Sequence, residues 1–231
     1  MAVRSGAEYA KETEDLPSRC YGTKADQARV AKIVELVGSG NRVLDIGCYD
    51  GAVGRLLIEK SNAVAGVEIS RTAAKKARKN GLDVAVQNIE SGLCFKDDSF
   101  DVVLAGEIIE HFLDTDFLLD EIRRVLVPSG SLVITTPNAA SLGRRIMLLL
   151  GRNPYFEASL GFPTNARAGH IRFFTRGLLI DFLRHKGFEI VSASSDAVNL
   201  TTSGKFASRT MARLIPGLGR SIIVKARMVS R

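Results

Sequence analysis

The chain is poor in the residues from which disulfide frameworks and zinc sites are built. Its three cysteines, Cys20, Cys48 and Cys94, are odd in number, widely spaced and without a CxxC pair. Such a set predicts neither a disulfide framework nor a zinc site, and we expect no metal centre. The low use of cysteine also favours a reducing, cytoplasmic compartment.

Long apolar runs are absent as well. The longest uncharged apolar patch, Ile146 to Leu150, is far shorter than the roughly 20 residues of a membrane-spanning helix. The polar N-terminus carries acids, which argues against a secretory signal. With 231 residues, 45 % of them apolar and 25 % charged, the chain is expected to form one globular domain over 1–231, with an N-terminal extension at 1–23.

Acidic residues are scarce in the second half of the chain. Residues 141–231 carry 15 Lys and Arg against 4 Asp and Glu, whereas residues 1–140 carry 17 against 21. No acid follows Asp196. This excess is either a solvated basic face or a surface for an anionic membrane, a phosphorylated lipid or an acidic substrate. Nucleic acid is disfavoured because no aromatic residues are interleaved with the basic ones.

Short β-type runs alternate with amphipathic segments, a pattern that predicts βαβ units and a parallel sheet. The expected strands are 42–46, 63–69, 83–87, 100–105, 131–136, 188–193 and 221–226. The expected helices are 24–37, 52–60, 71–79, 116–126, 139–150, 175–186 and 206–214. The predicted fold is α/β: a Rossmann-like, seven-stranded, mostly parallel sheet with an antiparallel last strand and helices on both faces.

The most informative stretch runs from Val43 to Gly54, where a buried strand enters a glycine-marked turn and then a helix. Glycine tolerates positive φ and lets a ligand approach the backbone, and the following helix start presents unpaired N–H groups. Glu68 ends the next apolar run, 21 residues after Gly47. An acid there can accept hydrogen bonds from both hydroxyls of a ribose. Together these features predict a nucleoside-bearing cofactor.

Five motifs in order give the chain a resemblance to a known family. They are Val43–Gly51, Val67–Ile69, Gln87–Glu90, Phe95–Val103 and Leu126–Leu132. The chain resembles the class I S-adenosylmethionine-dependent methyltransferases over residues 24–226, and in particular the small-molecule branch with quinone, lipid and sugar methyltransferases. The resemblance implies a transferase that uses S-adenosyl-L-methionine. Two positions depart from the family pattern: Tyr49 stands where Gly is frequent, and Asn88 where Asp is frequent.

The same resemblance implies which residues hold the cofactor. Glu68 would bind the ribose hydroxyls, Ile69 would pack on the adenine ring, and Asp45 would help to hold the amino end of the methionine moiety. The residues expected to line the pocket are Asp45, Gly47, Cys48, Tyr49, Gly51, Glu68, Ile69, Asn88, Ile89, Ala105 and Glu107. The alternatives are a solvated strand-end acid for Glu68 and a turn residue for Asn88.

An acceptor oxygen often has to lose a proton, and histidine is the usual base near neutral pH. His111 lies in an E-x-x-E-H segment after the fourth strand, and His170 follows an irregular loop. We hypothesise that His111 or His170 is the general base of an O-methylation. The alternatives are a structural hydrogen bond for His111 and a loop anchor for His170. A phenol or quinol that is already partly ionised would need no strong base.

Residues 139–169 are expected to form an insertion that recognises the substrate. This segment carries several arginines beside a strongly apolar run. It is either a helix packed on the core with a surface loop, or an amphipathic lid that contacts a membrane or a lipid-like acceptor. The expected acceptor is a small molecule, with lipid-linked and glycosylated ones included. No motif indicates which acceptor is used or the oligomeric state.

Two other functions compete with methyl transfer. A nicotinamide-dependent oxidoreductase is disfavoured, because Gly47, Gly51 and Gly54 give GxxxGxxG instead of GxGxxG. A non-catalytic homologue that binds the cofactor or a protein partner is the other alternative, and the departure at Tyr49 supports it.

Overall fold

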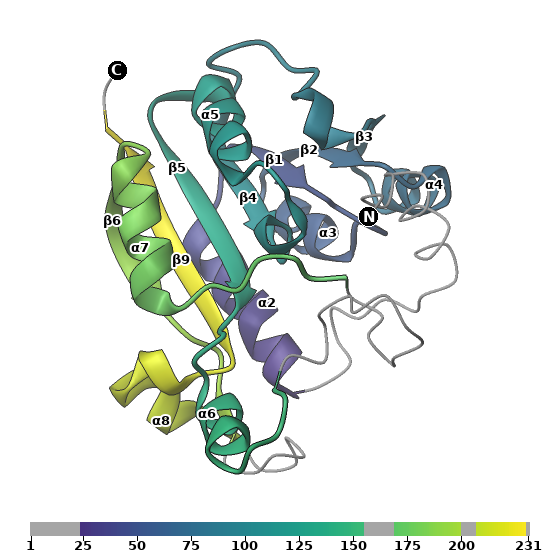
Figure 1. Cartoon of the computed structure of the whole chain (residues 1–231). Coiled ribbons are helices and arrows are strands. Elements are labelled where there is room, and N and C mark those ends of the chain that lie inside the picture. The colour runs from purple at the N-terminus through teal and green to yellow at the C-terminus, as the bar shows by residue number, and fades with distance from the viewer. Residues whose placement is uncertain (1–23, 155–168, 200–206, 230–231) are drawn as a thin grey trace.

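The computed structural model describes residues 24–154, 169–199 and 207–229 (Figure 1). The strands are β1 (Arg42–Ile46), β2 (Ala63–Glu68), β3 (Asp83–Val86), β4 (Phe100–Gly106), β5 (Leu126–Pro137), β6 (Phe188–Ser194), β7 (Val198–Asn199), β8 (Ala207–Ser208) and β9 (Ser221–Met228). The helices are α2 (Lys24–Val37), α3 (Ala52–Ile58), α4 (Arg71–Lys79), α5 (Thr115–Val125), α6 (Leu142–Leu149), α7 (Arg176–His185) and α8 (Arg209–Leu214). Short 3₁₀ turns are η2 (Ile89–Ser91), η3 (Ile109–His111) and η4 (Pro216–Leu218). The predicted extension 1–23 and residues 155–168 of the predicted insertion lie outside the described residues.

The main sheet has seven strands in the order β3-β2-β1-β4-β5-β9-β6. Strands β1 to β5 pair in parallel, and β9 pairs antiparallel with both β5 and β6. The predicted fold class is therefore confirmed. The strand order reverses between β1 and β4, and ligands of open α/β sheets bind at such a point, at the carboxyl ends of the strands.

Both faces of the sheet are buried under helices, as the alternation of strand residues requires. On one face Val43, Val102 and Val133 pack with residues of α2, α3 and α4. On the other face Leu44 and Val103 pack with residues of α5 and α7. The two hydrophobic clusters hold the strands in register and so fix where the strand ends lie.

Several element boundaries differ from those predicted. Strand β5 begins at Leu126, which pairs with Phe100 before a register shift to the Val102–Ser131 pair, so the predicted helix ends one residue early. Helix α6 begins only at Leu142, because the preceding residues bond elsewhere: Ala139 N–H donates to the Phe174 carbonyl. The β7–β8 pair was not predicted, since two-residue strands show no periodicity.

The start of α4 is capped by a side chain. The Ser70 hydroxyl accepts a hydrogen bond from the Ala73 N–H at 3.2 Å, which satisfies one of the free donors of the first turn. None of the helices in the described part of the chain is both long and apolar enough to cross a membrane.

Gly66 in β2 sets how closely the turn after β1 approaches the sheet. A Cβ at Gly66 would lie 2.6 Å from Cys48 Sγ and 3.1 Å from Cys48 Cβ. We predict that Gly66→Ala lowers the melting temperature because the Cys48 side chain must shift. Adding Cys48→Ala removes the nearest atom and should recover part of the loss. If the loss in the double variant equals the sum of the losses in the two single variants, the contact with Cys48 is not the cause.

Candidate functional site

The turn after β1 has an unusual backbone, with three residues in the left-handed region. Gly47 and Gly51 have φ of 70° and 77°, and Tyr49 has φ of 48°. The N–H groups of Gly47 and Cys48 both donate to the Val67 carbonyl, at 2.9 and 3.2 Å. A side chain costs energy in this conformation, which explains why glycine is frequent at the position of Tyr49.

Glu68, at the end of β2, accepts hydrogen bonds from the backbone of this turn and of the residues that follow β2. Its Oε2 accepts from the Tyr49 N–H at 3.0 Å and its Oε1 accepts from the Ser70 N–H at 2.8 Å. Burial raises the pKa of Glu68, and the backbone hydrogen bonds act in the opposite direction. A carboxylate offers about four lone-pair sites, so the backbone donors of Tyr49, Ser70 and Ile69 leave capacity for a ribose hydroxyl.

Asp45 is a buried acid whose surroundings fit a positively charged ligand group. Its carboxylate makes no hydrogen bond with the residues that the structure describes, and it is only 5 % exposed. Burial, and then the charge of Glu68, raises the pKa of Asp45 to about 7. A ligand ammonium or hydroxyl at this point would satisfy the carboxylate, as the predicted contact with the amino end of methionine requires.

Glu107 lies directly after β4, at the carboxyl end of that strand. It also takes a left-handed conformation, with φ of 55°. Its carboxylate accepts from the Thr135 hydroxyl at 2.9 Å and forms an ion pair with Arg29 of α2 at 3.0 Å. These two contacts come from different elements, and they hold the Glu107 side chain against the end of the sheet.

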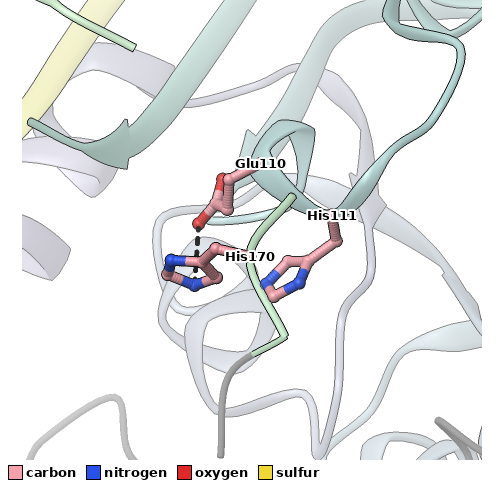
Figure 2. Close-up of side chains that lie close together, drawn as sticks. All are labelled: Glu110, His111 and His170. Atoms are coloured by element: carbon pink, nitrogen blue, oxygen red, sulfur yellow. Dashed lines mark ion pairs between the residues drawn. The ribbon is translucent and has the colours of Figure 1, made fainter. Parts of the chain in front are cut away.

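Two histidines and a glutamate converge beyond Glu107 (Figure 2). The rings of His111 and His170 meet edge to face with centroids 4.7 Å apart, and His170 Nε2 lies 4.0 Å from Glu110 Oε1. Burial lowers the pKa of both His111 and His170 to about 4, helped by His170 for the first and Arg144 for the second. Both rings are therefore neutral at neutral pH, and the contact of His170 with Glu110 is not an ion pair there.

A protein-family model described as "Methyltransferase domain" matches residues 21–193. The chain belongs to this family. Its predicted resemblance to the class I methyltransferases and its predicted cofactor, S-adenosylmethionine, are thereby confirmed. The oxidoreductase alternative finds no support.

Among curated proteins, this methyltransferase is similar to the ubiquinone biosynthesis O-methyltransferase of Xylella fastidiosa. The two are 29 % identical over 162 residues, which cover 68 % of this chain and 64 % of that protein. The chain thus matches less than two thirds of this relative's length.

Among solved structures, the chain is similar to a SAM-dependent methyltransferase of Thermotoga maritima, with a TM-score of 0.67 and 22 % identity. The match covers 95 % of this chain and 96 % of that one. The [4+2]-cyclase SpnF has a TM-score of 0.65 at 19 % identity, covering 94 % of this chain and 86 % of its own. At these identities the likeness concerns the fold alone.

Several residues predicted to line the methyltransferase pocket have side chains directed elsewhere. Cys48 packs in the core against Gly66, and burial raises the pKa of its thiol. Gly51 faces α4, since a Cβ there would lie 2.8 Å from Ala77 Cα. The side chains of Ile89 and Ala105 belong to the other core cluster. Any cofactor contact from Cys48, Ile89 and Ala105 would therefore be made by the backbone.

The remaining predicted positions lie at the surface of the site. Ile69 is half-buried directly after Glu68. Asn88 caps η2, because its Oδ1 accepts from the Glu90 N–H at 3.1 Å. This is the turn role that was the alternative for Asn88, and it leaves the amide N–H₂ group of Asn88 as the donor for a ligand.

Glu110 was not among the predicted site residues, although the E-x-x-E-H segment contains it. It is 1 % exposed, its Oε2 accepts from the Thr136 hydroxyl at 2.9 Å, and its pKa is raised well above the ordinary value by burial and by Glu107. The E-x-x-E-H motif predicted that functional residues follow β4. The pairing of Glu110 with His170 depends on tertiary contacts that no local pattern shows.

Asp45→Asn separates the cost of burying this acid from its use in binding. The pKa of Asp45 is raised in the folded state, so its contribution to stability is present below the unfolded pKa of about 4 and is lost as pH rises through about 7. We predict that Asp45→Asn melts at a higher temperature than the wild type at pH about 8, and that this difference is clearly smaller at pH about 5.

The same variant should bind S-adenosylmethionine and S-adenosylhomocysteine more weakly in calorimetry, because the amide carries no charge. NAD should bind neither protein. Asp83→Asn, a substitution at an exposed position of β3, is the control. An equal stabilisation at both pH values, or an unchanged affinity, would contradict the role given to Asp45.

Proposed function

We propose that this methyltransferase methylates an oxygen atom of a small acceptor bound at the carboxyl ends of β4 and β5. The observation that carries the proposal is the convergence of His111 and His170, both neutral at neutral pH, beyond the acids of β1 and β2 (Figure 2). The similarity to an O-methyltransferase of ubiquinone biosynthesis supports oxygen as the methylated atom.

The cofactor would be held by Glu68 at its ribose, by Asp45 at its amino end and by Asn88 at its adenine edge. When bound, S-adenosylmethionine supplies a methyl group already activated by its sulfonium charge. The remaining task of the chain is to position the acceptor and to receive its proton. The cofactor acids and the histidines come from different strand ends of the same sheet, so the acceptor would be bound beside the cofactor.

His111 and His170 are the groups proposed to receive that proton. A neutral imidazole carries a lone pair on one ring nitrogen, so it can accept a hydrogen bond from an acceptor hydroxyl and then its proton. The backbone directly after His170 is held next to Glu110, because the N–H groups of Ile171 and Arg172 both donate to the Glu110 carbonyl, at 3.0 and 3.1 Å. The base is thus held by backbone contacts on the adjacent residues.

We further propose that the ends of α6 and α8 contact an anionic membrane or a lipid-linked acceptor. Leu149 is 86 % exposed and Leu214 is 76 % exposed, each in a short helix that carries arginines and no acid. The two helices lie near each other in Figure 1, and both contact β7. Asn138, ahead of α6, donates to the carbonyls of Gly217 and Gly219 after α8, so hydrogen bonds join the segments next to the two helices.

Replacing each histidine tests the catalytic proposal. With an acceptor identified by methyl-labelled cofactor in a cell extract, we predict that His111→Ala and His170→Ala lower turnover by roughly 10²- to 10⁴-fold at saturating cofactor. Cofactor affinity by calorimetry should stay within about twofold, since the cofactor acids lie elsewhere. His185→Ala, at an exposed position of α7, should keep full turnover. Wild-type turnover in both site variants would rule out the acid–base role.

Liposome sedimentation tests the membrane contact. We predict that the chain pellets with anionic vesicles and less with neutral ones, because arginines and exposed leucines act together. Leu149→Glu combined with Leu214→Glu should abolish pelleting. Leu178→Glu, at a 54 % exposed position on α7, should leave it unchanged. Sedimentation that depends on neither lipid charge nor these leucines would remove the proposal.

A further inference from the structure

Glu110, His111 and His170 have the arrangement of a metal site as well as that of an acid–base group. One ligand atom of each residue lies within 4.8 Å of the ligand atoms of the other two. Figure 2 shows that Glu110 and His111 extend from η3 and that His170 approaches from the segment before α7. We propose that these three side chains bind a divalent transition-metal cation, with zinc as the first candidate.

The unpartnered oxygen of Glu110 is the observation that points to a ligand. Glu110 Oε1 is buried and has no hydrogen-bond partner, although the other oxygen is held by Thr136. A buried carboxylate oxygen without a partner costs free energy comparable to a lost hydrogen bond. It faces His170 Nε2 at 4.0 Å. A cation between the two atoms would satisfy both.

The surrounding contacts orient the three side chains as those around bound metals do. Thr136 donates to Glu110 Oε2, and the His111 imidazole hydrogen-bonds the backbone of Gly169. An imidazole that donates through one nitrogen presents the lone pair of the other. Second-shell bonds of this kind fix the ring tautomer and the direction of the ligand atom.

The donor set indicates which cation fits. Two imidazole nitrogens and one carboxylate oxygen suit zinc and its neighbours better than magnesium, which prefers oxygen ligands alone. A tetrahedral zinc ion with bonds of about 2.0–2.1 Å holds its ligands roughly 3.3 Å apart. The longest separations, up to 4.8 Å, must therefore close by about 1.5 Å, which side-chain rotation can supply. Three protein ligands leave one position open for another molecule.

Charges of both signs act on the cluster. Glu107 raises the pKa of Glu110 and Arg29 lowers it, while Arg144 lowers that of His170. Glu107 therefore favours a bound cation, whereas Arg29 and Arg144 oppose it. The expectation of no metal centre considered only cysteine spacing, whereas this cluster joins His and Glu residues from distant parts of the sequence.

This inference rests on the proposed function in one respect: it takes the open position as the place of the acceptor oxygen. A hydroxyl there would release its proton to solvent more readily because the cation stabilises the anion. The oxygen–methyl bond then forms as the sulfur–methyl bond breaks, and the sulfonium becomes a thioether. In this form His111 and His170 are ligands, and they act as bases only in the metal-free protein.

Metal binding by the full chain, without cofactor or acceptor, tests the inference. We expect the metal-free wild type to bind one equivalent of Zn²⁺, and Co²⁺ to give the intense visible bands of a tetrahedral site. His170→Ala and Glu110→Gln should weaken Zn²⁺ binding by more than the roughly 10- to 100-fold that a second-shell change costs. Thr136→Val, which removes only the second-shell bond to Glu110, should fall within that range.

His185→Ala is the matched control, since it removes the third histidine of the chain at an exposed position. Circular dichroism and S-adenosylmethionine calorimetry establish that each variant is folded. Failure of the wild type to bind zinc, or equal losses in His185→Ala and His170→Ala, would overturn the inference. Methyl transfer by a protein that binds no metal would refute the metal site and leave the proposed function standing. Metal binding without any methyl transfer would support the metal site and refute the proposed function.

Discussion

The hydrogen bonds of the Glu68 carboxylate hold together the strand ends that are proposed to bind the cofactor. By accepting from the N–H groups of Tyr49 and Ser70, the carboxylate joins the turn after β1, the end of β2 and the start of α4. The backbone hydrogen bonds offset part of the cost of burying Glu68, and the bond from Tyr49 holds that residue in a left-handed conformation that its side chain disfavours. This chain has Tyr49 where glycine is frequent, and it keeps the left-handed turn because Glu68 accepts a hydrogen bond from the Tyr49 N–H.

The architecture was predictable from local patterns, because the buried strands and amphipathic helices have clear periods. Side-chain directions in the turn were not. Cys48 follows a residue with positive φ, which turns its side chain into the core, and no spacing rule shows that. Leu126 was assigned to a helix because apolar residues suit both structures at a boundary. It joins β5 because Phe100 lies opposite it in the neighbouring strand.

The histidine cluster shows the same limit at the site itself. The segment around His111 was recognisable because it follows a strand end, where parallel sheets place functional residues. The approach of His170 depends on donation from Ile171 and Arg172 to the Glu110 carbonyl. Those bonds unite segments far apart in the chain, so the pairing of His170 with Glu110 could be found only from the structure.

The division of labour across the sheet explains why the family was predictable and the acceptor was not. The acids of β1 and β2 are the residues proposed to bind the cofactor, and they lie in motifs that the chain shares with its family. The proposed acceptor side lies at the end of β4 and depends on His170, which reaches it from a distant part of the sequence. SpnF, a cyclase with a similar fold, shows that this scaffold also carries other reactions. Because the fold alone does not fix the reaction, the proposals for this chain rest on the cluster of Glu110, His111 and His170 and on the exposed ends of α6 and α8.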